Sequence, residues 1–145
     1  MTHVLFDKHR RSGVDSNVLI HLLEGSGALA DKSAGVLDAI AAGDGSGVLA
    51  SLALAEICSG PAQMGDLAMV ERYADELTSL ENVQVVPLDA DVALDAAVIR
   101  GSTSMSLADA IHLACARHAG ATVFVTNDRR VTPINRLEVA YLDDL

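Results

Sequence analysis

Two acidic residues stand alone in apolar segments, and their carboxylates are the groups best placed to do chemistry. Glu56 is the single charge within residues 52–58, and Asp109 is the single charge within residues 107–115. Both segments have the composition of helices covered by other parts of the protein, so both carboxylates are expected to be partly desolvated. A buried carboxylate without a partner is costly or becomes protonated. The pattern therefore predicts a cation beside these acids.

Two further acids, Asp15 and Asp128, follow segments expected to be strands. Functional sites of open parallel sheets lie beyond the carboxyl ends of the strands. Each of these acids also has a local structural interpretation, because Asp15 could close an Asx turn and Asp128 could cap a helix. Asp109 could likewise complete a capping box. Glu56 lies inside its expected helix and has no such alternative role.

A shared divalent metal ion would balance the charge of four clustered acids. Lysines that could do so are scarce, since only Lys8 and Lys32 occur and neither is near these segments. Mg²⁺ prefers oxygen ligands and keeps several waters, so a few carboxylates suffice to hold it. Such an ion can lower the pKa of a bound water and so activate it as a nucleophile. No Ser–His–Asp or Cys–His arrangement indicates a protein nucleophile.

The elements that must position the four acids alternate between strands and helices. Strand-like runs cover residues 48–50, 83–88 and 122–126, with weaker ones around Asp15 and over 138–142. Helical patterns lie between them, over residues 16–24, 28–42, 52–59, 64–80, 90–100 and 106–119. This alternation is typical of βαβ units around a parallel sheet and predicts an α/β fold.

The composition limits the chain to one domain and excludes several classes of protein. It has 145 residues, of which 50% are hydrophobic and only 3% aromatic, so Ala, Leu, Val and Ile must form the core. No apolar run is long enough to cross a membrane. A net charge of −10 argues against non-specific binding to a phosphate backbone. Two cysteines, Cys58 and Cys115, suggest reduced thiols and a cytoplasmic location.

The first twelve residues differ from the rest in charge. Lys8, Arg10 and Arg11 against Asp7 give this segment a net charge of +2. Only Gly13 and Val14 precede Asp15 as strand-forming residues. We therefore expect a mobile, basic extension over residues 1–12 and a single domain over residues 13–145.

Four segments together resemble the PIN domain family, most closely the VapC-type toxins of toxin–antitoxin pairs. They are Val14-Asp15-Ser16-Asn17-Val18-Leu19-Ile20, Leu54-Ala55-Glu56-Ile57, Leu107-Ala108-Asp109-Ala110-Ile111-His112-Leu113-Ala114 and Val125-Thr126-Asn127-Asp128. The resemblance covers about residues 13–142. It implies a three-layer α/β/α sandwich with a mainly parallel central sheet, and an endoribonuclease that depends on Mg²⁺ or Mn²⁺.

The resemblance also implies roles for individual residues. The four acids of the family fall on Asp15, Glu56, Asp109 and Asp128, with Asp15 and Asp109 as the primary metal ligands. Glu56 and Asp128 would complete the ligand set or orient the attacking water. Three neighbouring polar residues are accessory candidates for holding metal or water: Asn17, Thr126 and Asn127.

The implied partners are an RNA substrate, a VapB-like antitoxin that covers the acids, and a second copy of the chain in a homodimer. Transfer RNA, ribosomal RNA and messenger RNA are all open as targets. Two other functions remain as alternatives: a non-catalytic PIN-like module that binds RNA or protein, and a stand-alone nuclease that processes RNA or DNA.

Three residues near the acids carry two interpretations each. His112 lies three residues after Asp109 and shares its helical face, but a packed core histidine is favoured over a contact with the metal site. Arg129 and Arg130 directly follow Asp128. They could hold RNA phosphates, or they could be a solvated charge pair.

Overall fold

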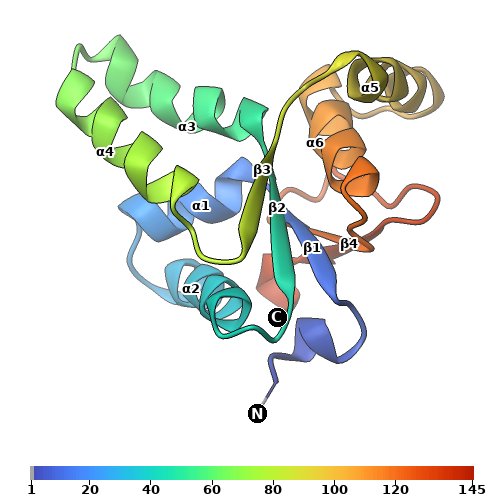
Figure 1. Ribbon diagram of the computed structural model, residues 1–145, viewed down its shortest axis with the longest axis horizontal. Helices are drawn as coiled ribbons and strands as arrows, with labels where there is room; N and C mark the ends of the chain where they lie inside the picture. Colours follow the sequence, from blue (N-terminus) through green and yellow to red (C-terminus); the bar gives the residue numbers. More distant parts are fainter. Residues whose placement is uncertain (1) are drawn as a thin grey trace.

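A five-stranded parallel sheet forms the centre of the protein (Figure 1). The computed structural model describes residues 2–145. The strand order is β3-β2-β1-β4-β5, and every neighbouring pair is parallel. The strands are β1 (Arg11–Val14), β2 (Ser46–Ala50), β3 (Val83–Val86), β4 (Val123–Thr126) and β5 (Glu138–Tyr141). The predicted α/β class is confirmed, and β1 occupies the middle of the sheet.

Helices cover both faces of this sheet, which confirms the three-layer α/β/α arrangement (Figure 1). One face carries α1 (Ser16–Glu24), α2 (Ala28–Ala41), α3 (Ser51–Gln63) and α4 (Leu67–Thr78). The other carries α5 (Ala90–Ser102) and α6 (Leu107–His118). Two short 3-10 helices, η1 (Val4–Asp7) and η2 (Leu142–Asp144), lie near the chain ends. Within residues 2–145, none of these helices is long and apolar enough to span a membrane.

Alternating side chains along the strands divide the interior into two cores. Leu49 and Val125 point into the core beneath α1 to α4. Val48 and Phe124 point to the opposite core, beneath α5 and α6. This period of two is the expected geometry of a strand, and burial on both faces explains the apolar runs of β2 and β4.

The six predicted helices are all present, with one clear shift in their ends. The helix expected over residues 52–59 continues to Gln63, with Pro61 inside its last turn. Proline removes one backbone donor there, and the exposed end of α3 tolerates that loss. The chain then reverses at Gly65, whose φ of 71° suits glycine.

The segment before β1 is packed on the domain, which differs from the expected mobile extension over residues 1–12. Leu5 and Phe6 are buried in the larger core. His9 is also buried, with Nδ1 2.8 Å from the Thr122 hydroxyl and Nε2 3.0 Å from the Glu138 carboxylate. The strand begins at Arg11 rather than Gly13. Burial of the apolar side chains of Leu5 and Phe6 stabilises this packing, while Lys8 and Arg10 stay exposed to solvent.

Gly13 permits a close approach of α6 to the central strand. A Cβ atom at this position would lie 2.6 Å from Cβ of Ala116 and 2.7 Å from Cδ1 of Phe124. Both neighbours are buried and cannot move aside. Because α6 carries Asp109 and β1 leads into Asp15, this packing sets the separation of two of the predicted site residues.

We expect Gly13→Ala to lower the free energy of unfolding by about 1–3 kcal/mol, the usual cost of overpacking a tight core. Gly60→Ala is the matched control, because a Cβ there meets nothing within 4 Å. In the interior of an exposed helix that change should stabilise by about 0.5–1 kcal/mol. Urea unfolding of the two variants measures both effects. Equal stabilities for the two variants would contradict the close packing of β1 and α6.

Candidate active site

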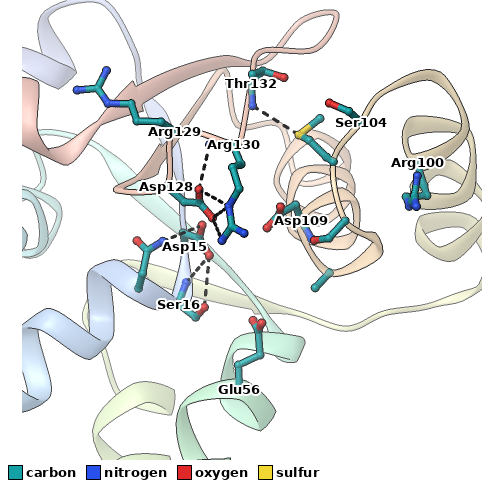
Figure 2. Close-up of a pocket in the computed structure, with 14 residues that line it drawn as sticks. Asp15, Ser16, Glu56, Arg100, Ser104, Asp109, Asp128, Arg129, Arg130 and Thr132 are labelled. Carbon is teal, nitrogen blue, oxygen red and sulfur yellow. Dashed lines mark hydrogen bonds and ion pairs between the residues drawn. The ribbon is translucent and has the colours of Figure 1, made fainter.

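The four predicted acids line one open cleft of about 690 Å³ at the carboxyl ends of the central strands (Figure 2). Asp15 directly follows β1, and Asp128 lies just beyond β4. Glu56 comes from α3, which starts immediately after β2, and Asp109 comes from the first turn of α6. The chain runs from β1 to β2 on one side and places β4 on the other. This is the kind of switch point at which α/β proteins form their sites.

Asp15 is the most deeply placed of the four acids, with only 5% of its surface exposed. It is the N-cap of α1 and accepts a hydrogen bond from the backbone N–H of Ser16 at 2.8 Å. Burial, the largest influence, raises the pKa of Asp15, although the charge of His112 and a hydrogen bond from Thr126 lower it. The residues around Asp15 therefore do not fully compensate the burial of its negative charge.

Asn17 and Thr126 hold Asp15 in place. The Thr126 hydroxyl donates to Oδ2 of Asp15 at 2.7 Å, and the Asn17 amide donates to the same oxygen at 3.3 Å. The Thr126 oxygen in turn accepts the backbone N–H of Asp128 at 3.1 Å. Both residues therefore orient acids, and Thr126 does so from a fully buried position.

Asn127 differs from the accessory role expected for its side chain. Its backbone N–H donates to Oδ1 of Asn17 at 3.1 Å. Its side-chain amide lies 3.2 Å from the carboxylate of Asp143, in the 3-10 helix η2. The side chain is thus directed to the carboxyl-terminal segment, and Asn127 serves the site through its backbone.

His112 lies beneath the acids and contacts two of them. Its Nε2 is 2.5 Å from Oε1 of Glu56 and 3.9 Å from Oδ1 of Asp15. The prediction that His112 is a packed core histidine is correct as to burial, since only 2% of its surface is exposed. That prediction did not include the contacts with Glu56 and Asp15. The spacing of three residues from Asp109 was the available signal, because it puts both side chains on one face of α6.

The pairing of His112 with Glu56 shifts both pKa values. The hydrogen bond from His112 lowers the pKa of Glu56, and this outweighs the effect of partial burial. Burial is the largest influence on the pKa of His112 and lowers it, but the hydrogen bond to Glu56 and the charges of the surrounding acids raise it on balance. We assign the proton to Nε2, because Nδ1 is buried and has no hydrogen-bond partner among residues 2–145.

Asp109 presents its carboxylate to the cleft, and the cap of its helix is supplied by another residue. The hydroxyl of Ser106 accepts the backbone N–H of Asp109 at 3.1 Å and so caps α6. In the described part of the chain, the Asp109 carboxylate itself has no hydrogen-bond or ion-pair partner. It is thus available to a ligand.

Asp128 is paired with Arg130, while Arg129 turns away. Nε and Nη2 of Arg130 lie 3.0 Å and 2.9 Å from the two carboxylate oxygens of Asp128. These hydrogen bonds lower the pKa of Asp128. Arg129 instead pairs with Asp144 at 3.1 Å and stacks over the ring of Tyr141 (Figure 2 shows its side chain directed away from the acids).

The donor set suits a hard divalent cation such as Mg²⁺ or Mn²⁺. All four acids offer oxygen atoms, and the deepest carboxylate is desolvated without a full countercharge. Across residues 2–145, however, no three metal-ligating side chains already converge on one point. Two of the acids are instead paired with bases, Glu56 with His112 and Asp128 with Arg130. Asp15 and Asp109 would hold the ion, and Glu56 and Asp128 would complete its ligand set or orient a water molecule.

The sequence of the chain matches the family model of the PIN domain over residues 14–137, which is most of its length. The chain belongs to the PIN domain family. The matched range includes all four acids of the cleft. The chain matches no curated protein sequence at a significant level.

Several solved structures share the fold of this chain. FitAcB from Neisseria gonorrhoeae has a TM-score of 0.72 at 20% identity, over 92% of this chain and 99% of that chain. VapBC2 from Rickettsia felis, bound to a promoter DNA fragment, has a TM-score of 0.71 at 15% identity, over 90% and 98%. VapC20 from Mycobacterium tuberculosis, a toxin that cleaves the sarcin–ricin loop, has a TM-score of 0.59 at 19% identity, over 78% and 86%. At these identities the likeness concerns the fold.

The raised pKa of Asp15 predicts how the metal-free protein responds to pH. The folded protein binds more protons than the unfolded chain between the two pKa values of this carboxyl, so stability falls as the pH rises through that window. Asp15→Asn keeps the size and the helix cap but removes the charge. We expect this variant to unfold at a higher temperature than the wild type near pH 7 in EDTA.

Thermal unfolding between about pH 4 and pH 8 measures the effect, because this range begins near the ordinary pKa of aspartate. Asp91→Asn makes the same substitution at an exposed position in the first turn of α5, so it is the control and should not be stabilised relative to the wild type. A difference between Asp15→Asn and wild type that does not grow with pH would contradict the desolvation of Asp15.

Proposed function

We propose that the protein is an endoribonuclease that depends on Mg²⁺ or Mn²⁺ and acts in the cytoplasm as the toxin of a VapBC-type pair. The observation that carries this proposal is the convergence of four carboxylates, from four separate elements, on one open cleft of a PIN fold. Phosphodiester hydrolysis by bound divalent cations needs this set of oxygen donors and no protein nucleophile.

A divalent cation held here would lower the pKa of a water molecule and neutralise charge on the phosphate. The residues of the chain divide the remaining work. Asp15 and Asp109 bind the ion, and Thr126 and Asn17 keep the Asp15 carboxylate oriented. Glu56 lies at the side of the cleft, with one oxygen held by His112. Its second oxygen would orient the attacking water.

The shape and charge of the cleft fit a phosphodiester chain better than a small molecule. It is open, and three exposed arginines line it beside the acids: Arg100, Arg129 and Arg130. The aromatic residue Phe124 is buried in β4, so no platform for stacking bases is formed there. Recognition of RNA would then rest on backbone shape and a few polar contacts.

An antitoxin is the partner that this function requires, because a free ribonuclease of this kind would attack the RNA of its own cell. Structures with the same fold include a toxin–antitoxin complex from Klebsiella pneumoniae and DNA-bound VapBC from Salmonella typhimurium. By this likeness we propose a VapB-like antitoxin that covers the acids. The family resemblance also supports a homodimer.

We expect purified protein, freed of any antitoxin, to cut RNA in Mg²⁺ or Mn²⁺ and to leave it intact in EDTA. Asp109→Asn should reduce the rate at least about 100-fold, because even residues behind a metal ligand cost 10- to 100-fold when changed. Asp91→Asn makes the same chemical change outside the cleft and should cut at the wild-type rate. Gel analysis of total RNA and of separate transfer, ribosomal and messenger RNA measures the cleavage.

Cleavage by Asp109→Asn at the wild-type rate would contradict the assignment of the site. If no RNA class is cut by the wild type with metal present, the protein is instead a PIN module that binds RNA or protein without catalysis. Cleavage of DNA as well as RNA would favour a stand-alone processing nuclease.

A further inference from the structure

Arg130 is the one base lining the cleft, among the described residues, whose guanidinium lies on an acid of the site (Figure 2). It approaches Asp128 side-on, with Nε at 3.0 Å and Nη2 at 2.9 Å from the two carboxylate oxygens. Asp128 also accepts the backbone N–H of Arg130 at 2.9 Å. The guanidinium is close enough to Asp109 to be influenced by its charge as well.

The ion pair between Arg130 and Asp128 can be exchanged at little energetic cost. The Arg130 side chain is 87% exposed, whereas that of Asp128 is 22% exposed. Exposed ion pairs contribute little to stability, because water and salt compete for both charges. The pair lies in a turn after β4, so release of the guanidinium disturbs no helix or strand. A divalent cation offers Asp128 a stronger partner than an exposed arginine does.

Because Arg130 lines the cleft, the released guanidinium stays beside the acids and can bind a phosphate there. Its planar donor fork matches phosphate oxygens in the same two-point manner as it matches a carboxylate. The adjacent Arg129 pairs with Asp144 and stacks on Tyr141, away from the four acids. It therefore has no acid of the cleft to exchange for a phosphate.

We propose that Arg130 is an exchangeable counter-ion. It neutralises Asp128 while the cleft is empty of cations, and it transfers to a phosphate of the substrate when a divalent cation takes Asp128. The second half of this proposal rests on the function proposed above, because it names a phosphodiester as the substrate. The first half concerns metal binding alone.

The exchange predicts opposite effects of one substitution on two ligands. In Arg130→Gln, the cation no longer competes with the guanidinium, so Mn²⁺ should bind about 2- to 5-fold more tightly by calorimetry. In Ca²⁺, Arg130→Gln should bind a labelled single-stranded RNA about 10-fold more weakly than the wild type does, because one charge-assisted contact is lost. The slope of log affinity against log salt concentration should fall by about 0.7, as expected for one phosphate contact to a single strand.

Arg129→Gln is the matched control, since it removes the same charge from the neighbouring residue without freeing an acid of the cleft. Its Mn²⁺ affinity should stay close to that of the wild type. Both arginine side chains are largely exposed, so both variants should fold, and their unfolding temperatures verify this.

Equal Mn²⁺ affinities for the two variants would overturn the exchange, and so would unchanged RNA affinity of Arg130→Gln. Failure of the wild type to bind Mn²⁺ at all would overturn both this proposal and the metal-dependent function. Tighter Mn²⁺ binding and weaker RNA binding in Arg130→Gln, with no cleavage by the wild type, would support the exchange and refute catalysis.

Discussion

A carboxylate buried at the end of the central strand is the constraint on which the rest of the site depends. Asp15 lies where β1 meets α1, and its surroundings can hydrogen-bond its charge but do not fully balance it. Hydrogen bonds from Thr126, Asn17 and Ser16 account for both oxygens, yet the pKa of the acid stays raised. Desolvation of a charge is costly unless an opposite charge is close. A cation bound beside Asp15 would balance this charge, and this is the physical basis of the metal site proposed above.

The fold brings three more acids to the same place, which adds to the negative charge there. Their elements are far apart in the sequence, and the parallel sheet aligns the ends from which they project. Close packing of α6 on Gly13 brings Asp109 toward Asp15, and the direct passage from β2 into α3 brings Glu56. Bases already occupy two of the acids, His112 on Glu56 and Arg130 on Asp128. The chain itself therefore neutralises part of the negative charge of the cleft.

Much of this arrangement could be predicted from the sequence because charge is rare in apolar segments. Glu56 and Asp109 were identifiable by their isolation, and Asp15 and Asp128 by their positions after strand-like runs. The alternation of strands and helices was enough for the α/β class and for the number of helices.

Pairings across the fold could not be predicted in this way. The periodicity of α6 indicates that His112 is buried, but its contact with Glu56 depends on how α3 crosses α6. Likewise, the sequence shows Arg129 and Arg130 as equivalent neighbours, and the fold separates them, one to Asp144 and one to Asp128. The burial of Leu5 and Phe6, in the segment expected to be mobile, is a related case, because it depends on contacts with distant parts of the chain that no local pattern reveals.

The central claim is that the four carboxylates form a site for a divalent cation. Crystals of the antitoxin-free protein soaked in Mn²⁺ and measured near its absorption edge test this most directly, since anomalous scattering locates the ion without reference to activity. We predict one principal anomalous peak in contact with carboxylate oxygens of Asp15 and Asp109. A cleft without a peak at saturating Mn²⁺, or a principal peak on residues away from these acids, would contradict the account.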